Sequence, residues 1–394
     1  MLKVGIVGCG KVADEHASQI QRIEGCEIVG VCDREPLMAR QLYERFAVKR
    51  YFSDLMEFLG QAKPDVVHIT TPPQSHFDIA KRCLELGCHV YVEKPFTLYG
   101  EEAERLIALA NERRLKITAG HDDQFRPAAR RMRALVESGF LGTGPVHMDS
   151  YYCYELGQSD YAGALLGDKG HWVHRLPGKL LQNIISHGIA RIAEFLVTDS
   201  PHIIADGFTS PRLRDMGETE IIDELRVIIS EEERTTAYFT FSTQMRPSLH
   251  EFRIYGAKNG LILDQDQETL IKLRGDRFKS YVEKFLPPAI LAAQYLGNLK
   301  TNMRNFIRSD FHMKAGMKYL VESFYRSIVE NTSLPIPYRE ILLTARIMDA
   351  IFGQLDAQRL ARRPILRVGR AANPVEATSV ASRFRASASR SRAL

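Results

Sequence analysis

The N-terminal segment limits the fold of this chain more than any other feature. Residues 2–7 form a short apolar run, and the sequence GCGKVA at 8–13 follows it directly and opens a helical pattern. The first glycine of such a turn permits the tight bend, the second leaves room for a pyrophosphate, and the alanine allows close helix packing. The free N–H groups of the helix N-terminus favour an anion. The residues expected to line this turn are Gly8, Gly10, Lys11 and Val12.

Apolar runs and helical patterns alternate regularly along residues 2–120. The runs lie at 27–33, 65–71, 88–95 and 116–120, and helical patterns lie from Lys11, up to Phe46, near 53–59, at 77–86 and at 100–113. Strands and helices at this spacing predict βαβ units. We therefore expect an α/β domain of the Rossmann type over residues 1–122, with a doubly wound parallel sheet covered on both faces.

The pattern changes after Pro127. Helical patterns at 128–138 and 180–195 are followed by strand-like runs at 222–230, 235–244, 250–256 and 260–265, with period-two alternation and glycine-containing turns. This predicts an α+β domain over residues 123–360 with a large, mainly antiparallel open sheet. Open sheet faces are usually covered, so we expect a homodimer or homotetramer. Helical patterns at 285–308, 316–330 and up to Leu360 complete the domain.

Charge and composition exclude several classes of protein. The formal net charge is +5, but residues 361–394 carry eight Arg against one Glu, a net of +7, which leaves −2 for the body. We therefore expect no nucleic-acid partner and a disordered basic tail. No apolar stretch approaches the roughly 18–20 residues that span a bilayer, so no membrane partner is expected. The six cysteines form no CxxC pair, which is typical of free thiols in a reducing compartment and predicts a cytoplasmic protein.

Asp33 supports a dinucleotide at the glycine turn. It ends the second apolar run, 23 residues beyond Gly10, where a carboxylate can accept both hydroxyls of an adenosine ribose and repel a 2′-phosphate. This favours NAD, although the adjacent Arg34 leaves NADP open, and Asp33 as a mere turn residue is the alternative. Strand ends line the ligand crevice of such sheets, so the cofactor is also expected beside Thr70, Thr71, Pro72 and His76.

Glu93-Lys94-Pro95 is the most informative tripeptide. It ends an otherwise apolar run, and two charges at the inner end of a strand need a reason because unpaired buried charge is costly. A lysine there can hydrogen-bond a reacting hydroxyl or carbonyl and help move its proton. We expect Glu93 to border the cofactor and Lys94 to contact both cofactor and substrate; a surface ion pair closing the strand is the alternative.

With GCGKVA, Asp33, TPPQSH and EKP in this order, the chain resembles the glucose-fructose oxidoreductase/inositol dehydrogenase/MocA family. The resemblance implies NAD(P)-dependent oxidation or reduction of a carbon of a sugar, cyclitol or nucleotide sugar, with Lys94 in the reaction. It also implies an Asp-x-x-x-His element, matched here by Asn183 and His187, which an i, i+4 spacing places on one helix face. His187 is the expected general acid/base, since imidazole titrates near neutral pH.

Two departures from the family pattern bear on the chemistry. Asn183 can hydrogen-bond a substrate hydroxyl but cannot take a proton or hold negative charge, which leaves proton transfer to His187 and Lys94. In GHDDQFRP at 120–127, acidic residues and a glutamine stand where the family segment carries Asn and Arg, which puts phosphate contacts from that segment in doubt. Near His187, Trp172 and His174 are expected to line the sugar site.

Three alternatives stay open. The first is a zinc ion on His171, His174 and His187. It is disfavoured because the resemblance implies no metal, and we predict no metal site. The chain could instead retain NAD and use transient oxidation to cleave a glycosidic bond. It could also be a non-catalytic, nucleotide-binding sensor, as Asn183 and the basic tail suggest.

Overall fold

The computed structural model describes residues 1–155, 168–275, 278–308 and 314–362. Its contacts divide the chain into a unit of residues 1–356 and a second unit of residues 357–394. The predicted tail, 361–394, lies outside the described residues apart from Ala361 and Arg362, which still belong to the last helix. Everything that positions the site belongs to the first unit.

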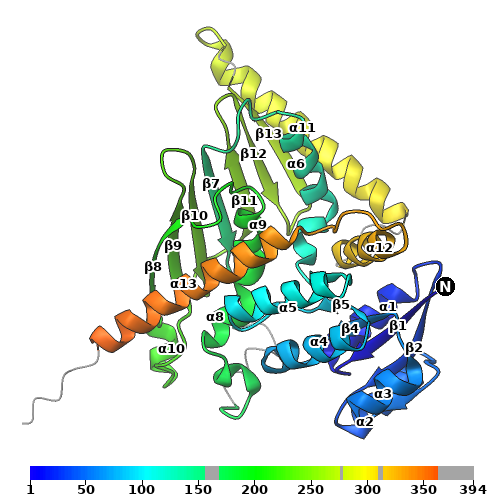
Figure 1. The fold of residues 1–394 in the computed structure, drawn as a ribbon. Helices are drawn as coiled ribbons and strands as arrows, with labels where there is room; N and C mark the ends of the chain where they lie inside the picture. Colours follow the sequence, from blue (N-terminus) through cyan, green and yellow to red (C-terminus); the bar gives the residue numbers. More distant parts are fainter. Residues whose placement is uncertain (156–167, 276–277, 309–313, 363–394) are drawn as a thin grey trace, which may run out of the picture. The chain divides into compact units, whose positions relative to one another are not determined.

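The first sheet is parallel throughout, as predicted (Figure 1). Its strand order is β3-β2-β1-β4-β5-β6, which reverses direction between β1 and β4, and ligands bind at such a switch point beyond the carboxyl ends of the strands. The strands are β1 (Leu2–Val7), β2 (Cys26–Cys32), β3 (Tyr51–Phe52), β4 (Val66–Ile69), β5 (His89–Val92) and β6 (Ile117–Ala119). The helices between them are α1 (Lys11–Ile20), α2 (Pro36–Arg45), α3 (Leu55–Ala62), α4 (His76–Glu85) and α5 (Gly100–Glu112).

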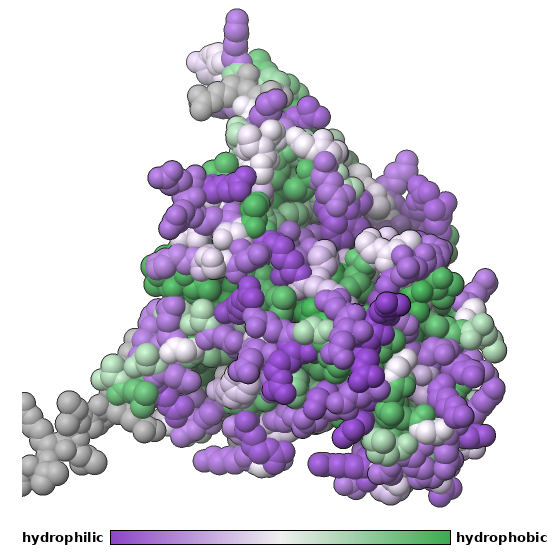
Figure 2. Space-filling model, in the orientation of Figure 1, coloured by the Kyte–Doolittle hydropathy of each residue, from purple (hydrophilic) through white to green (hydrophobic). Residues whose placement is uncertain are grey.

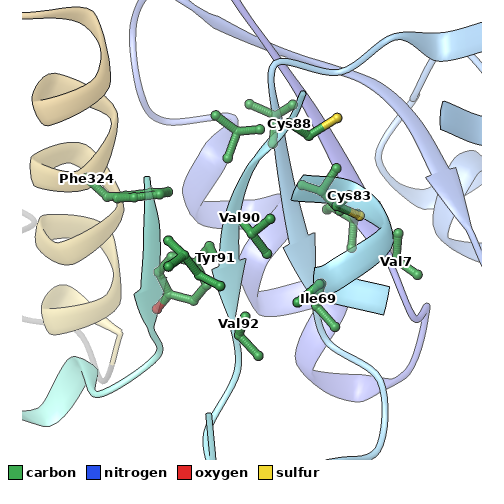
Figure 3. Packing of buried hydrophobic residues seen from close by; sticks show 14 of the residues in the cluster. Val7, Ile69, Cys83, Cys88, Val90, Tyr91, Val92 and Phe324 are labelled. Atoms are coloured by element: carbon green, nitrogen blue, oxygen red, sulfur yellow. The ribbon is translucent and has the colours of Figure 1, made fainter. Parts of the chain in front are cut away.

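A helix from far along the chain packs on this first sheet. Phe324 of α12 (Ala315–Val329) is fully buried, and its ring lies 6.3 Å from that of Tyr91 on β5. Figure 3 shows Phe324 reaching toward Tyr91, while Cys83 of α4 lies on the other side of the strand. The core of the first sheet therefore includes residues that follow the second sheet in sequence. The predicted domain bounds, 122/123 and 360/361, stay a prediction.

The second sheet has the order β13-β12-β11-β7-β10-β9-β8, and only the pairing of β7 with β10 is parallel. The predicted α+β fold is thus confirmed. Four strands match predicted runs: β9 (Glu224–Ser230), β10 (Thr236–Ser242), β11 (His250–Tyr255) and β12 (Asn259–Asp264). Three further strands were not predicted: β7 (His147–Tyr152), β8 (His202–Phe208) and β13 (Thr269–Arg274).

Two short helices, α8 (Lys179–Ile184) and α9 (Ser186–Ala193), replace the single helix expected over 180–195. The division falls at Ile185, which keeps helical dihedral angles. A Cβ on Gly188 would lie 2.4 Å from the Phe239 ring on β10, and Ser150 Oγ of β7 donates to Gly188 O at 3.1 Å. The glycine thus lets α9 press directly onto the sheet, which fixes the position of His187.

The remaining helices lie outside these two layers of strands. α11 (Val282–Ile307) continues through Pro287 and Pro288, and Asn298, its one buried residue, bonds the backbone N–H and C=O of Leu270 on edge strand β13. Figure 2 shows apolar surface in the part of the molecule where α11 and β13 lie. Among the described residues, none of the helices combines the length and the apolar character needed to cross a lipid bilayer. The others are α6 (Pro127–Glu137), α10 (Pro211–Asp215), α13 (Tyr338–Arg362) and the 3₁₀ turns η1 (Pro73–Ser75), η2 (Asp122–Phe125) and η3 (Trp172–Arg175).

Candidate active site

The glycine turn leaves an open surface at the N-terminus of α1. Gly8 has a φ of +93°, and a Cβ there would lie 2.7 Å from the backbone nitrogen of Thr71. Gly10 is the N-cap of α1 with no side-chain cap, and a Cβ there would meet nothing within 4 Å. Uncapped N–H groups facing open space suit a pyrophosphate. Lys11 and Val12 follow Gly10 and are exposed, so the residues present fit a dinucleotide.

Asp33 can act both as a turn residue and as a carboxylate for the ribose hydroxyls. Its Oδ2 accepts from the Cys9 N–H at 2.7 Å and its Oδ1 from the Glu35 N–H at 2.9 Å, so the carboxylate ties the glycine turn to the end of β2. Each carboxylate oxygen has a further lone pair, and Asp33 is partly exposed. The side chain can therefore organise the turn and still accept ribose hydroxyls. Arg34 beside it is exposed.

The segment after β4 borders the glycine turn. Thr70 Oγ1 donates to Gly8 O at 2.6 Å, and Thr71 Oγ1 accepts from Ser75 Oγ at 2.8 Å. Pro72 is exposed. His76 is different: it is fully buried, and its two ring nitrogens lie 2.9 Å from Pro95 O and Thr71 O. His76 thus connects the segment after β4 to the EKP loop, and its contact with cofactor stays a prediction.

Glu93 is held from behind by a buried chain of side chains. His16 Nε2 lies 2.8 Å from Glu93 Oε1, the two Nδ1 atoms of His16 and His68 lie 2.8 Å apart, and His68 Nε2 lies 2.8 Å from the Tyr325 hydroxyl. Burial alone would raise the pKa of Glu93, but the hydrogen bond to His16 and the charge of Lys94 lower it to about 2. Glu93 is therefore a charged anchor for the loop that carries Lys94.

Lys94 reaches across to the second sheet's helices. Its Nζ donates to the backbone oxygen of Asn183 on α8 at 3.1 Å. His187 stands four residues further on, at the start of α9. The structure therefore brings together the lysine and the histidine singled out in the sequence. The role of the Asn183 side chain stays a prediction.

His187 is buried, with 8% of its surface exposed. Burial, together with the charge of Lys94, lowers the pKa of His187 to about 4, although Asp123 opposes that shift. The imidazole is thus neutral at physiological pH. Its pKa lies below the near-neutral value that was expected from the sequence. Its Nδ1 lies 3.7 Å from Asp123 Oδ2 and has no hydrogen-bond partner among the described residues.

Asp122 and Asp123 are not among the site residues predicted from the sequence. The acidic pair was noted only as a departure that weakens phosphate contacts, whereas η2 places Asp123 beside His187. Ligand atoms of Asp122, Asp123 and His187 lie within 4.8 Å of one another, and this is the one group of metal-ligand type found in the described part of the chain. It includes neither His171 nor His174, the other histidines considered for zinc.

Trp172 and His174 lie on η3, directly before α8. The Gln74 side chain of η1 donates to Trp172 O at 3.0 Å, so η3 lies beside the segment that follows β4. Both side chains are partly exposed. Their contact with a sugar stays a prediction, but η3 is close to the elements that carry the other site residues.

The segment that forms the first sheet is similar to a known protein family. Residues 2–121 match the family model described as an oxidoreductase family with an NAD-binding Rossmann fold. The chain is 32% identical over 142 residues to D-glucoside 3-dehydrogenase of Escherichia coli, which covers 36% of this chain and 40% of that protein. It is 20% identical over 308 residues to myo-inositol 2-dehydrogenase of Thermotoga maritima, covering 77% and 88%. D-glucoside 3-dehydrogenase and the next two curated relatives are matched over less than half of their own length.

Solved structures share the fold over most of the chain. UDP-N-acetylglucosamine 3-dehydrogenase of Acidithiobacillus ferrooxidans superposes with a TM-score of 0.68 at 19% identity, over 90% of this chain and 98% of the other. The WlbA dehydrogenase of Bordetella pertussis, solved with NADH and UDP-GlcNAcA, gives 0.68 at 16% identity over 91% and 97%. Residues 2–121 of this chain therefore resemble the NAD-binding Rossmann domain of the glucose-fructose oxidoreductase/inositol dehydrogenase/MocA family of oxidoreductases.

Proposed function

We propose that the chain is an NAD-dependent oxidoreductase that interconverts a hydroxyl and a keto carbon of a sugar, cyclitol or nucleotide sugar. The observation that carries the proposal is the bond from Lys94 Nζ to the backbone of Asn183, four residues before His187. It brings the lysine that ends a strand of the cofactor domain and the histidine of the second sheet's helices to one place. A sensor that only binds nucleotide has no need of this convergence.

When bound, the nicotinamide accepts or donates the hydride of the substrate carbon. The residues of the chain handle the oxygen. Lys94 donates a hydrogen bond to the reacting oxygen and stabilises negative charge developing on it. His187, neutral because burial lowers its pKa to about 4, accepts the hydroxyl proton as the carbonyl forms and returns it in the reverse reaction.

NAD is preferred over NADP in this proposal because the Asp33 carboxylate closes β2 beside the glycine turn. Its hydrogen bonds from Cys9 and Glu35 hold it in place, and a 2′-phosphate there would meet negative charge. Calorimetry with each dinucleotide tests the preference. Tighter binding of NADP would show that the exposed Arg34 decides the choice instead.

The function is tested by screening sugars, cyclitols and nucleotide sugars with each dinucleotide, read as nicotinamide absorbance. Lys94→Ala should lower turnover by about 10²- to 10⁴-fold and leave NAD affinity nearly unchanged. Lys81→Ala, which removes an exposed lysine paired with Glu85 on α4, is the matched control. Full activity of Lys94→Ala would remove its catalytic role. Cleavage of a glycoside without accumulating NADH would favour the NAD-retaining alternative, and binding without turnover the sensor.

A homodimer or homotetramer formed through the second sheet is part of the proposal. Ile204, Ile228 and Tyr238 are partners on adjacent strands β8, β9 and β10, and 44–50% of each is exposed. Burying such a row against a second copy would stabilise the assembly. Sedimentation should show Ile228→Glu shifted toward monomer, while Leu37→Glu on exposed α2 is not. Wild-type protein sedimenting as a monomer would contradict the assembly.

A cytoplasmic location is likewise proposed. All six cysteines are free, and five of them are buried. Thiols in this state suit a reducing compartment. Fractionation of cells that produce the protein, with detection of the chain in each fraction, tests the location.

A further inference from the structure

We propose that Asp123 is the carboxylate partner of His187, a positioning residue that sets the orientation and tautomer of the imidazole for proton transfer. The proposal rests on the proposed function and adds a residue to it. Asn183, an amide, cannot hold the negative charge that a histidine base needs beside it. Asp123 of η2, whose Oδ2 lies 3.7 Å from His187 Nδ1, supplies that charge.

Three side chains converge on a single oxygen of Asp123. Tyr152 of β7 donates its hydroxyl hydrogen to Oδ2 at 3.3 Å, His187 Nδ1 lies 3.7 Å from Oδ2, and Arg191 Nη2 lies 3.9 Å from it. The His187 Nδ1 and all three guanidinium nitrogens of Arg191 are buried without a hydrogen-bond partner in the described part of the chain. Leaving buried donors unpaired is costly, so a small approach to Asp123 is favourable.

Asp123 remains charged despite its burial. Burial alone would raise its pKa, but the positive charges of His187 when protonated, of Arg191 and of Arg126 outweigh burial and hold the pKa below its ordinary value. Burial and the negative charge of Asp123 raise the pKa of its neighbour Asp122 to about 7. The pair therefore keeps a full negative charge on Asp123, the member that faces His187, over the working pH range.

A carboxylate beside Nδ1 selects one form of the imidazole. It favours the tautomer with the proton on Nδ1, which leaves Nε2 as the acceptor. During oxidation the substrate O–H bond breaks, its proton moves to Nε2, the C–H electron pair leaves as hydride to the nicotinamide, and the carbonyl forms. Asp123 stabilises the imidazolium until the proton passes to solvent.

The other charged groups around His187 either oppose or reinforce the effect of Asp123 on the protonation of the imidazole. Lys94 and Arg191 disfavour the imidazolium, and Glu93 favours it, as Asp123 does. The rings of His121 and Tyr152 lie 6.2 Å and 6.0 Å from the His187 ring. A divalent cation held by Asp122, Asp123 and His187 is the competing interpretation, but Arg191 and the Tyr152 hydroxyl already face the oxygen that a cation would need.

The test is Asp123→Asn, assayed with the sugar substrate and NAD. Turnover should fall by about 10²- to 10⁴-fold, with NAD affinity unchanged by calorimetry. Asp123 raises the pKa of His187, so the acid limb of the kcat/KM profile for oxidation should move to lower pH. A purely structural loss would lower the plateau without moving the limb. Asp123→Glu, which retains the charge, should keep the limb in place.

The matched control is Asp149→Asn. It breaks another His-Asp pair, between Asp149 Oδ1 and His147 Nε2 at 3.3 Å. Asp149 lies on β7 next to Ser150, which faces α9, so its side chain points to the other face of the sheet. This variant should keep the wild-type rate and limb. Wild-type turnover with an unmoved limb in Asp123→Asn would overturn the proposal.

A measurement without turnover separates this proposal from the proposed function. With ¹⁵N-labelled histidine, and His187→Gln to assign its signal, wild-type protein should carry the His187 proton on Nδ1, and Asp123→Asn should show both tautomers. A wild-type proton on Nε2 overturns the proposal, even if the enzyme is active. Absence of hydride transfer to every sugar tested, with the Nδ1–H tautomer present, would instead refute the proposed function. Activity that is lost with EDTA and restored by Mg²⁺ or Zn²⁺ would overturn the pair in favour of a cation.

Discussion

Gly8 and Gly10 stand two residues apart in one motif, but the structure predicts opposite consequences for replacing them. At Gly10 the backbone has a φ of −79°, which alanine adopts readily, and a Cβ would meet nothing within 4 Å. Gly10→Ala should therefore change the free energy of unfolding by less than about 1 kcal/mol. The methyl group would occupy the space above the α1 N-terminus, so NAD affinity should fall about 10-fold or more.

Gly8→Ala should act on stability. Its φ of +93° lies in the region that L residues avoid, at a cost of about 1–2 kcal/mol. The added Cβ would also lie 2.7 Å from the Thr71 backbone nitrogen and 2.8 Å from the Thr70 carbonyl carbon. Backbone atoms cannot turn aside as a flexible side chain does, so the total should reach about 3 kcal/mol or more. The melting temperature should drop by on the order of 10 °C.

Thermal unfolding without cofactor and calorimetry with NAD separate the two effects. Gly10→Ala should melt like wild type and bind NAD weakly, and NAD should raise its melting temperature less than that of wild type. Gly8→Ala should melt early with or without NAD. Wild-type NAD affinity in Gly10→Ala would refute the placement of the pyrophosphate at this turn. Wild-type stability in Gly8→Ala would refute the steric reasoning.

Two further predictions concern buried groups of the first sheet. The pKa of Glu93 is lowered from 4.5 to about 2, so between these two pH values the unfolded chain binds the proton first and stability is lost as the pH falls. Glu93→Gln should lose up to about 3 kcal/mol at neutral pH and show a flatter acid limb in urea titrations at several pH values. Phe324→Ala should cost about 3–5 kcal/mol in the same assay because Phe324 is fully buried. Phe306→Ala, at a position 72% exposed, should change the free energy of unfolding by no more than about 0.5 kcal/mol. Equal losses in the two variants would contradict the packing of α12 on the sheet.

The central strands of the first sheet could be predicted because each is a continuous apolar run. Such a run is typical of a strand that is buried on both faces. The two-residue strand β3 (Tyr51–Phe52) could not, because a pairing this short depends on its neighbour β2. Edge strands β8 and β13 were not predicted either, although each pairs with its neighbour in sequence, β9 and β12. The division of the helical pattern at Ile185 has no proline or glycine to signal it. Local patterns therefore predicted the layers but not every strand, since the central strand β7 was missed as well.

The candidate site was predictable where a residue ends a strand or opens a helix. The glycine turn, Asp33 and Lys94 belong to this class, because the strand pattern alone places them at one edge of the sheet. Asp123 was missed because its significance is its distance to His187, 64 residues away in sequence, and no period encodes such a contact. The available signal was the acidic pair itself. Two carboxylates in a segment that the tertiary fold partly buries need counter-charges, and Arg191 and Arg126 provide them.

The position of Lys94 depends on both sheets and not on its strand alone. Behind the loop, Glu93 is tied through His16 and His68 to Tyr325 of α12, which follows the second sheet in sequence. In front, the Lys94 Nζ is held by a backbone oxygen of α8. Neither contact exists unless the chain has formed the second sheet and returned to the first. Assembly of the reacting groups is thus coupled to completion of the fold, so a folded fragment of residues 2–121 would be expected to retain the glycine turn but lose the geometry of Lys94.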